Sequence, residues 1–290
     1  MSAEAEGRSA AERFREKQHL GVQPLGDLVA TIEQATGIDV AVLDADRNEH
    51  GLTMRDPQRG AVFIGVARTR RPMRQRSTLA HELGHVLFGD VAGGAAGTWS
   101  DRSPEEIRAD AFARHLLIPA EGLHGFLDER RGPLTQSALS DVVQRFLVSP
   151  AIAAIALGQA GYIDAATKQE WVALTAPRLA TRFGWSDQYR ALQDESDQRR
   201  APQRLLARAI SAYAEGVLSV QAIATLRGIT RQEAEAELRE AGVVPAERPL
   251  AWADPTELPD ADVDLTALDT ALDGPDHDTE SPDVTTRGNG

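Results

Sequence analysis

The sequence predicts an α+β fold, in which a mostly helical domain carries a small β-sheet beside one central helix and is followed by an all-helical C-terminal region. Apolar residues recur at helical spacing over most of the chain, and only two short stretches change to the pattern of strands. The chain has 290 residues, of which 42% are hydrophobic, so it can bury a core in at least one compact unit.

Two helices are predicted at the start of the chain, over residues 9–18 and 24–36, and Gly37 is placed to end the second one. The pattern then changes to that of strands. Residues 38–42 alternate in character, and residues 61–66 form a run rich in apolar and β-branched side chains. These two stretches are expected to pair in a small sheet.

Two further helices are predicted after the strands. The first can be capped by Ser77 or Thr78 and is predicted to run to about Phe88, with Gly89 just past its end. The second is predicted over 103–118, because a proline follows it and cannot continue a helix.

Helical patterns continue to about residue 245. Residues 137–147 and 150–160 form a predicted helical pair, and the last forty residues of the chain are too poor in large apolar groups to offset the entropy of ordering. The predicted organisation is an N-terminal domain with the appended helical pair (1–165), a linker or helical connection (166–200), a small helix-turn-helix-like module (201–245) and a disordered acidic tail (246–290).

The charge of the chain is unevenly placed. Residues 251–290 hold eleven of the 44 acidic residues and one of the 31 basic residues, which leaves 33 acids and 30 bases in the preceding part. No cluster of Lys and Arg marks a nucleic-acid interface, so direct contact with nucleic acid is not expected. An apolar signal segment and a run of 18 apolar residues are both missing, which indicates a cytoplasmic protein without a membrane span.

The segment His81-Glu82-Leu83-Gly84-His85 lies inside the helix predicted to end at Phe88. Residues four apart share one face of a helix, so both imidazoles can bind one metal ion. Glu82 is placed to act as general base toward water at that ion. The chain has no cysteine, so a zinc ion would be held by imidazole and carboxylate alone. The alternative is a surface helix with two exposed histidines, but its apolar residues indicate a packed helix.

A catalytic zinc ion needs a third protein ligand. A third histidine is excluded, because the positions that would carry the required Gly and His are Phe88 and Val91. The following helix offers Glu106 as the ligand. Asp110, four residues later on the same face, would accept the free ring N–H of a ligand histidine.

Other interpretations of these acids stay open. Ser103 and Glu106 have the spacing of a capping box, which would explain the glutamate without a metal. Asp110 could be a solvated helix position, and Glu105 is the fallback ligand. The group that would stabilise an oxyanion cannot be chosen by spacing among four candidates: His50, Arg71, Arg74 and Tyr162.

Residues 77–85, Ser-Thr-Leu-Ala-His-Glu-Leu-Gly-His, and residues 106–119, which follow on the next helix, together resemble the ImmA/IrrE metallopeptidases. The similarity includes positions that take no part in chemistry and extends over about residues 10–165. Two positions differ from the family pattern. Members often have a histidine where this chain has Gly89, and an acid where it has Arg108. Neither difference removes a ligand.

The resemblance implies a zinc endopeptidase of the glutamate-zincin type that acts inside bacteria on a regulatory protein, often a helix-turn-helix repressor. Zinc would be bound by His81, His85 and Glu106, and Glu82 would transfer the proton. A substrate in extended form is expected to pair with the edge of the sheet near residues 61–66.

A different function remains possible for the same residues. Residues 210–243 resemble the helix-turn-helix-like module of some small antitoxins, but the last helix of this segment is rich in glutamate, which favours a protein partner over DNA. The alternative is a non-catalytic or latent regulatory, antitoxin-like protein-binding module on a metallopeptidase scaffold. An intact Glu82 beside the ligands favours the enzyme.

Overall fold

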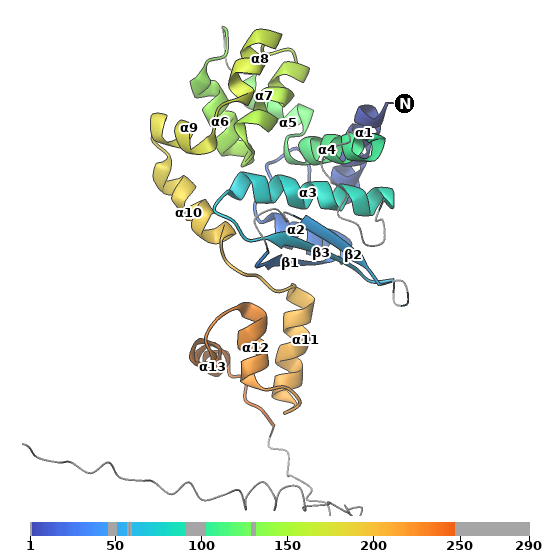
Figure 1. Cartoon of the computed structure of the whole chain (residues 1–290), viewed down its shortest axis with the longest axis vertical. Helices are drawn as coiled ribbons and strands as arrows, with labels where there is room; N and C mark the ends of the chain where they lie inside the picture. The colour runs from blue at the N-terminus through green and yellow to red at the C-terminus, as the bar shows by residue number, and fades with distance from the viewer. Residues whose placement is uncertain are drawn as a thin grey trace, which may run out of the picture. The chain divides into compact units, whose positions relative to one another are not determined.

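The computed structural model describes residues 2–45, 51–56, 58, 60–90, 103–128 and 132–246. These residues form an α+β protein, as the sequence predicts, with one small sheet among many helices (Figure 1). The predicted acidic tail, 246–290, lies outside the described residues except for Ala246. The helices are α1 (Ala3–Lys17), α2 (Leu28–Thr36), α3 (Pro72–Phe88), α4 (Pro104–Leu117), α5 (Ala120–Leu127), α6 (Gln136–Phe146), α7 (Pro150–Gln159), α8 (Ala165–Val172), α9 (Ala176–Arg182), α10 (Ser186–Ser196), α11 (Gln203–Ala214), α12 (Val220–Arg227) and α13 (Arg231–Glu240).

The sheet consists of β1 (Asp39–Leu43), β2 (Gly51–Arg55) and β3 (Val62–Ala67), in the order β1-β3-β2. Strand β3 is parallel to β1 and antiparallel to β2. The two predicted strands correspond to β1 and β3. Strand β2 was not predicted. It has only five residues, and its two large apolar side chains, Leu52 and Met54, are exposed.

The expectation that residues 61–66 form a sheet edge is wrong. Strand β3 is hydrogen-bonded on both sides, so its backbone groups are already paired. The edge on this side of the sheet is β2, which crosses α3 and contacts it directly.

Helix α3 begins earlier than the sequence suggested. Its first residue is Pro72, whose fixed φ suits the first position of a helix. Ser77 does not cap the helix, and its hydroxyl instead donates to the carbonyl of Arg74 at 2.9 Å. The predicted end is correct, because Phe88 is the last residue and Gly89 adopts the left-handed conformation at φ 75°.

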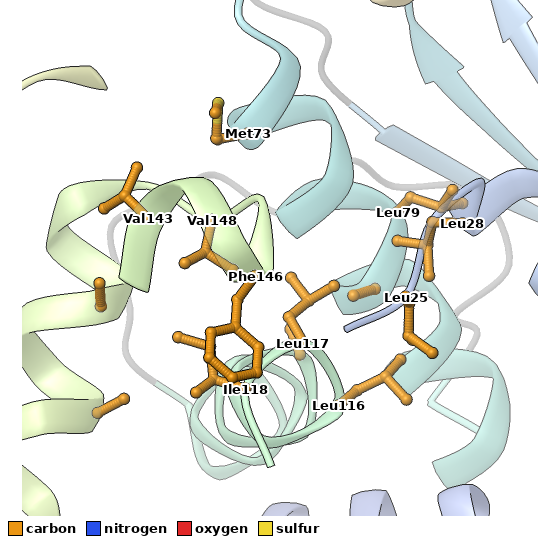
Figure 2. Packing of buried hydrophobic residues seen from close by; sticks show 14 of the residues in the cluster. Leu25, Leu28, Met73, Leu79, Leu116, Leu117, Ile118, Val143, Phe146 and Val148 are labelled. Atoms are coloured by element: carbon orange, nitrogen blue, oxygen red, sulfur yellow. The ribbon is translucent and has the colours of Figure 1, made fainter. Parts of the chain in front are cut away.

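The main core lies between α3 and the helices packed around it (Figure 2). Helix α1 packs along α4, where Phe14 and Phe112 meet edge to face with ring centroids 6.0 Å apart. The contact is close because α1 presents Gly7 to α4, where a Cβ atom would lie 2.6 Å from the Cβ of Ala111. Figure 2 labels part of this core: Leu25, Leu28, Met73, Leu79, Leu116, Leu117, Ile118, Val143, Phe146 and Val148.

Residues 166–200, expected to form a helical connection, contain most of α8 and all of α9 and α10. Their large apolar side chains belong to the main core, since Trp171, Leu179 and Trp185 are almost fully buried in it. The indole N–H of Trp185 donates to the buried hydroxyl of Ser140 at 2.9 Å. These helices are therefore packed as part of the same core.

Helices α11, α12 and α13 enclose a second, smaller core around Ile223, Ala224 and Leu238. This group is tied to the sheet region by polar contacts near the start of α11. The backbone N–H of Gln203 donates to the buried Glu33, at 3.1 Å from Oε1, and Arg204 Nε is 3.0 Å from Asp39 Oδ1.

Among the described helices, none alone combines the length and apolar character needed to cross a bilayer. Helices α6 and α7 meet these criteria only when taken together, and they are bent by 108° at the break between them. The turn at this break contains Leu147 in the left-handed conformation, and both helices contribute residues to the main core.

Candidate metal centre

Helix α3 places His81 and His85 on one face, with their Nε2 atoms 2.9 Å apart and both side chains 15% exposed. Helix α4 contributes Glu106, whose Oε2 is 3.2 Å from His81 Nε2 and whose Oε1 is 3.4 Å from His85 Nε2. One ligand atom from each residue lies within 4.8 Å of the others. The structure thus brings together the three side chains that the sequence suggested as metal ligands.

These side chains fit a zinc ion in donor type and in spacing. Two imidazoles and one carboxylate form a common ligand set of catalytic zinc, which keeps a fourth position for water or substrate. Nitrogens bound to one tetrahedral zinc ion lie about 3.3 Å apart, given zinc–nitrogen distances of about 2.0–2.1 Å. The imidazoles of His81 and His85 would therefore separate by only a few tenths of an ångström to accept the ion.

The two helices that carry the ligands approach each other closely at Gly84. A Cβ atom at this position would lie 3.2 Å from the Cα of Ala109 and 3.3 Å from the ring of Phe112. Both of these α4 residues are fully buried. Because the contact is backbone against small side chain, the start of α4 lies near enough for Glu106 to reach both histidines.

The capping box that the sequence left open at Ser103 and Glu106 is only half formed in the structure. The backbone N–H of Glu106 donates to Ser103 Oγ at 3.4 Å, so Ser103 caps α4 as predicted. The Glu106 carboxylate, however, lies against the two histidines. Glu105, the fallback ligand, is fully exposed, and hydrogen bonds with its own backbone and with Ser103 hold its pKa below the ordinary value.

Asp110 lies beside His81, with its Oδ1 2.9 Å from Nδ1. Since a carboxylate only accepts, Nδ1 carries the proton and Nε2 is left to bind a metal. Burial lowers the pKa of His81, but the hydrogen bond to Asp110 and the charges of Asp110, Glu106 and Glu82 outweigh it. The pKa of His81 therefore lies above its ordinary value.

Glu82 is held by strand β2, which sequence reasoning had missed. Thr53 Oγ1 donates to Glu82 Oε2 at 2.7 Å. Strand and helix are in direct contact at Gly51, where a Cβ atom would lie 2.7 Å from Glu82 Oε1 and 2.6 Å from Thr78 Cγ2. The position of Glu82 thus depends on a glycine and a threonine that lie far from it in sequence.

Among the described candidates for stabilising an oxyanion, Arg71, Arg74 and Tyr162, none forms a hydrogen bond or ion pair with the cluster. His50 lies outside the described residues, and Arg71 and Arg74 are exposed at the start of α3. The Tyr162 hydroxyl is 2.7 Å from His124 Nδ1.

Comparison with known families gives one finding. Residues 33–157 match the family described as Peptidase_M78, IrrE N-terminal-like domain. The matched segment contains the sheet, α3, α4 and most of α7, and it excludes α1. No curated protein matches the chain.

Proposed function

Residues 33–157 form an IrrE N-terminal-like domain of the ImmA/IrrE metallopeptidase family, and on this premise we propose that the chain is a zinc-dependent endopeptidase. The observation that carries the proposal is the cluster of His81, His85 and Glu106, with Glu82 beside it on the same helix. A scaffold that only binds partners has no use for a base at this place.

In the proposed reaction the chain supplies orientation and proton transfer. A zinc ion, when bound, would act as a Lewis acid toward the peptide carbonyl and would increase the acidity of water. His81, His85 and Glu106 would hold the ion. Glu82 would accept a proton from the attacking water and pass it to the nitrogen of the leaving amine. The hydrogen bond from Thr53 keeps the carboxylate of Glu82 in a fixed orientation for both transfers.

The proposed substrate is an intracellular protein, such as a helix-turn-helix repressor, as the family resemblance suggests. An extended segment of the substrate would pair, by backbone hydrogen bonds, with the edge of β2 that no other described strand occupies. Support for this placement comes from Thr53, because a peptide beside β2 would lie next to the residue that contacts Glu82.

The test is elemental analysis of bound metal in the purified wild type, His81→Ala and Glu106→Ala. We expect about one zinc ion per chain in the wild type and a loss in both variants. Glu105→Ala is the matched control, because it removes an exposed acid next to Glu106 and should leave the zinc in place. Absence of any transition metal from the wild type after zinc loading would refute the proposal.

Peptidase activity is tested separately from metal binding. Glu82→Gln should retain zinc and lose cleavage of candidate repressor proteins, since the amide cannot accept the proton. If the wild type binds zinc and a repressor but Glu82→Gln and the wild type behave alike over long incubations, the non-catalytic binding module becomes the better assignment.

A further inference from the structure

His85 has a buried ring nitrogen that the proposed ligand set leaves unused. Its Nε2 faces His81 and Glu106, so Nδ1 points to the other side. This Nδ1 atom is buried and has no hydrogen-bond partner within the described part of the chain. Histidines that bind metals almost always donate their second N–H to a carboxylate or carbonyl, as His81 does to Asp110.

The carboxylate of Asp90 lies close to this atom, with Oδ2 3.8 Å from His85 Nδ1. Its position is fixed by the end of α3. Gly89 takes the left-handed conformation there, and the backbone N–H of Asp90 donates to the carbonyl of His85 at 2.9 Å. The Asp90 side chain is only 12% exposed. The gap exceeds an ordinary hydrogen bond by about 1 Å, which a small movement of the ring can close.

Arg108 holds the Asp90 carboxylate in this place. Its Nε donates to Asp90 Oδ2 at 3.1 Å, and its Nη2 donates to Oδ1. The guanidinium also lies 4.7 Å from the centroid of the Phe88 ring and 3.7 Å from Glu6. Arg108 stands two residues after Glu106 on α4, so it joins the end of one ligand helix to the start of the other.

We propose that Asp90 is the positioning residue of His85 and that Arg108 orients Asp90 for this role. With a metal on Nε2, the Nδ1–H of His85 donates to Asp90 Oδ2, which also accepts from Arg108 Nε, while Oδ1 accepts from Arg108 Nη2. Asp90 then orients the imidazole of His85, as Asp110 orients that of His81. The inference rests on the proposed metal site.

The contact with Asp90 gives a physical reason for an arginine at position 108, where the ImmA/IrrE pattern has an acid. An acid at 108 would repel Asp90, whereas the planar guanidinium matches both carboxylate oxygens.

The experiment measures the zinc dissociation constant of the full chain by competition with a chromophoric chelator. Asp90→Asn should weaken zinc binding by roughly 10- to 100-fold, the range for loss of such partners, and Asp110→Asn should have a similar effect. Arg108→Gln should weaken binding less than Asp90→Asn, and Arg108→Lys should recover part of that loss. Asp194→Asn is the control, because Asp194 pairs with Arg70 at 3.0 Å on the surface and should leave the constant unchanged.

A second measurement reports on the hydrogen bond itself. In the zinc-loaded wild type, nitrogen-15 NMR should show His85 protonated at Nδ1 with a slowly exchanging proton, and this proton should exchange rapidly in Asp90→Asn. Metal bound through His85 Nδ1 would overturn the inference, as would unchanged zinc affinity in Asp90→Asn when Asp110→Asn is weakened. The second outcome would leave the proposed function standing, whereas a wild type without zinc would refute both.

Discussion

Replacing Gly7 by alanine should destabilise the protein, because the loss in packing exceeds the gain in helix propensity. In a helix interior, alanine is favoured over glycine by about 0.5–1 kcal/mol. At this position, however, the new Cβ atom would lie 2.3 Å from the carbonyl oxygen of Arg108 and 2.6 Å from the Cβ of Ala111. Helix α1 would have to move away from α4 by about 1 Å, and overpacking of this kind costs about 1–3 kcal/mol.

The net effect of Gly7→Ala is therefore a loss of about 1–2 kcal/mol, or a decrease in Tm of roughly 2–8 °C for a chain of this size. Urea and thermal unfolding of the metal-free protein measure it. Gly125→Ala in α5 is the matched control, because a Cβ atom there meets nothing within 4 Å and the change should stabilise the protein. If Gly7→Ala is as stable as the wild type while Gly125→Ala gains stability, the tight α1–α4 contact is incorrect.

Three further predictions concern other contacts of the structure. Ser140→Ala removes the acceptor of the buried Trp185 N–H and should cost about 1–3 kcal/mol in urea unfolding, so an unchanged midpoint would contradict this hydrogen bond. Burial raises the pKa of Glu4, but the contacts with Arg114 and Gln159 outweigh burial, so the pKa lies below the ordinary value of 4.5. Ionised Glu4 therefore stabilises the fold above pH 4.5, and this stabilisation is lost as the pH falls through the lowered pKa. Glu4→Gln should therefore flatten the acid limb of a plot of stability against pH, and an unchanged slope would argue against the assignment. Thr53→Val should leave zinc content unchanged and slow peptide hydrolysis by roughly 10- to 100-fold, the value of a hydrogen bond to a charged group, whereas Thr53→Ser should retain the rate.

The sequence revealed those parts of the site that lie on one helix. His81, Glu82 and His85 are close in sequence, and the spacing of four residues determines which side chains share a face. Glu106 and Asp110 were found by the same argument on α4. The capping box at Ser103 left the direction of the Glu106 side chain undecided, because a cap and a ligand require the same residue type at the same place.

The parts that the sequence did not reveal depend on contacts between distant segments. Thr53 lies 29 residues before Glu82, on a strand of five residues whose large apolar side chains are exposed. Arg108 reaches Asp90 across the gap between two helices, and nothing in the local sequence shows that these residues meet. A local sequence pattern shows which side chains share one face of a helix or strand. Which distant segment packs against that face depends on how the whole chain folds.

The position of α1 has a consequence for the smallest polypeptide that can fold on its own. Residues 33–157 define the segment shared with the family, yet Phe112 of α4 packs against Phe14, which lies outside that segment. A polypeptide restricted to it would also lack Trp171 and Trp185 from the core. Such a fragment would expose a large apolar surface to water and would tend to aggregate. The segment that matches the family is therefore shorter than the segment that this protein needs in order to fold on its own.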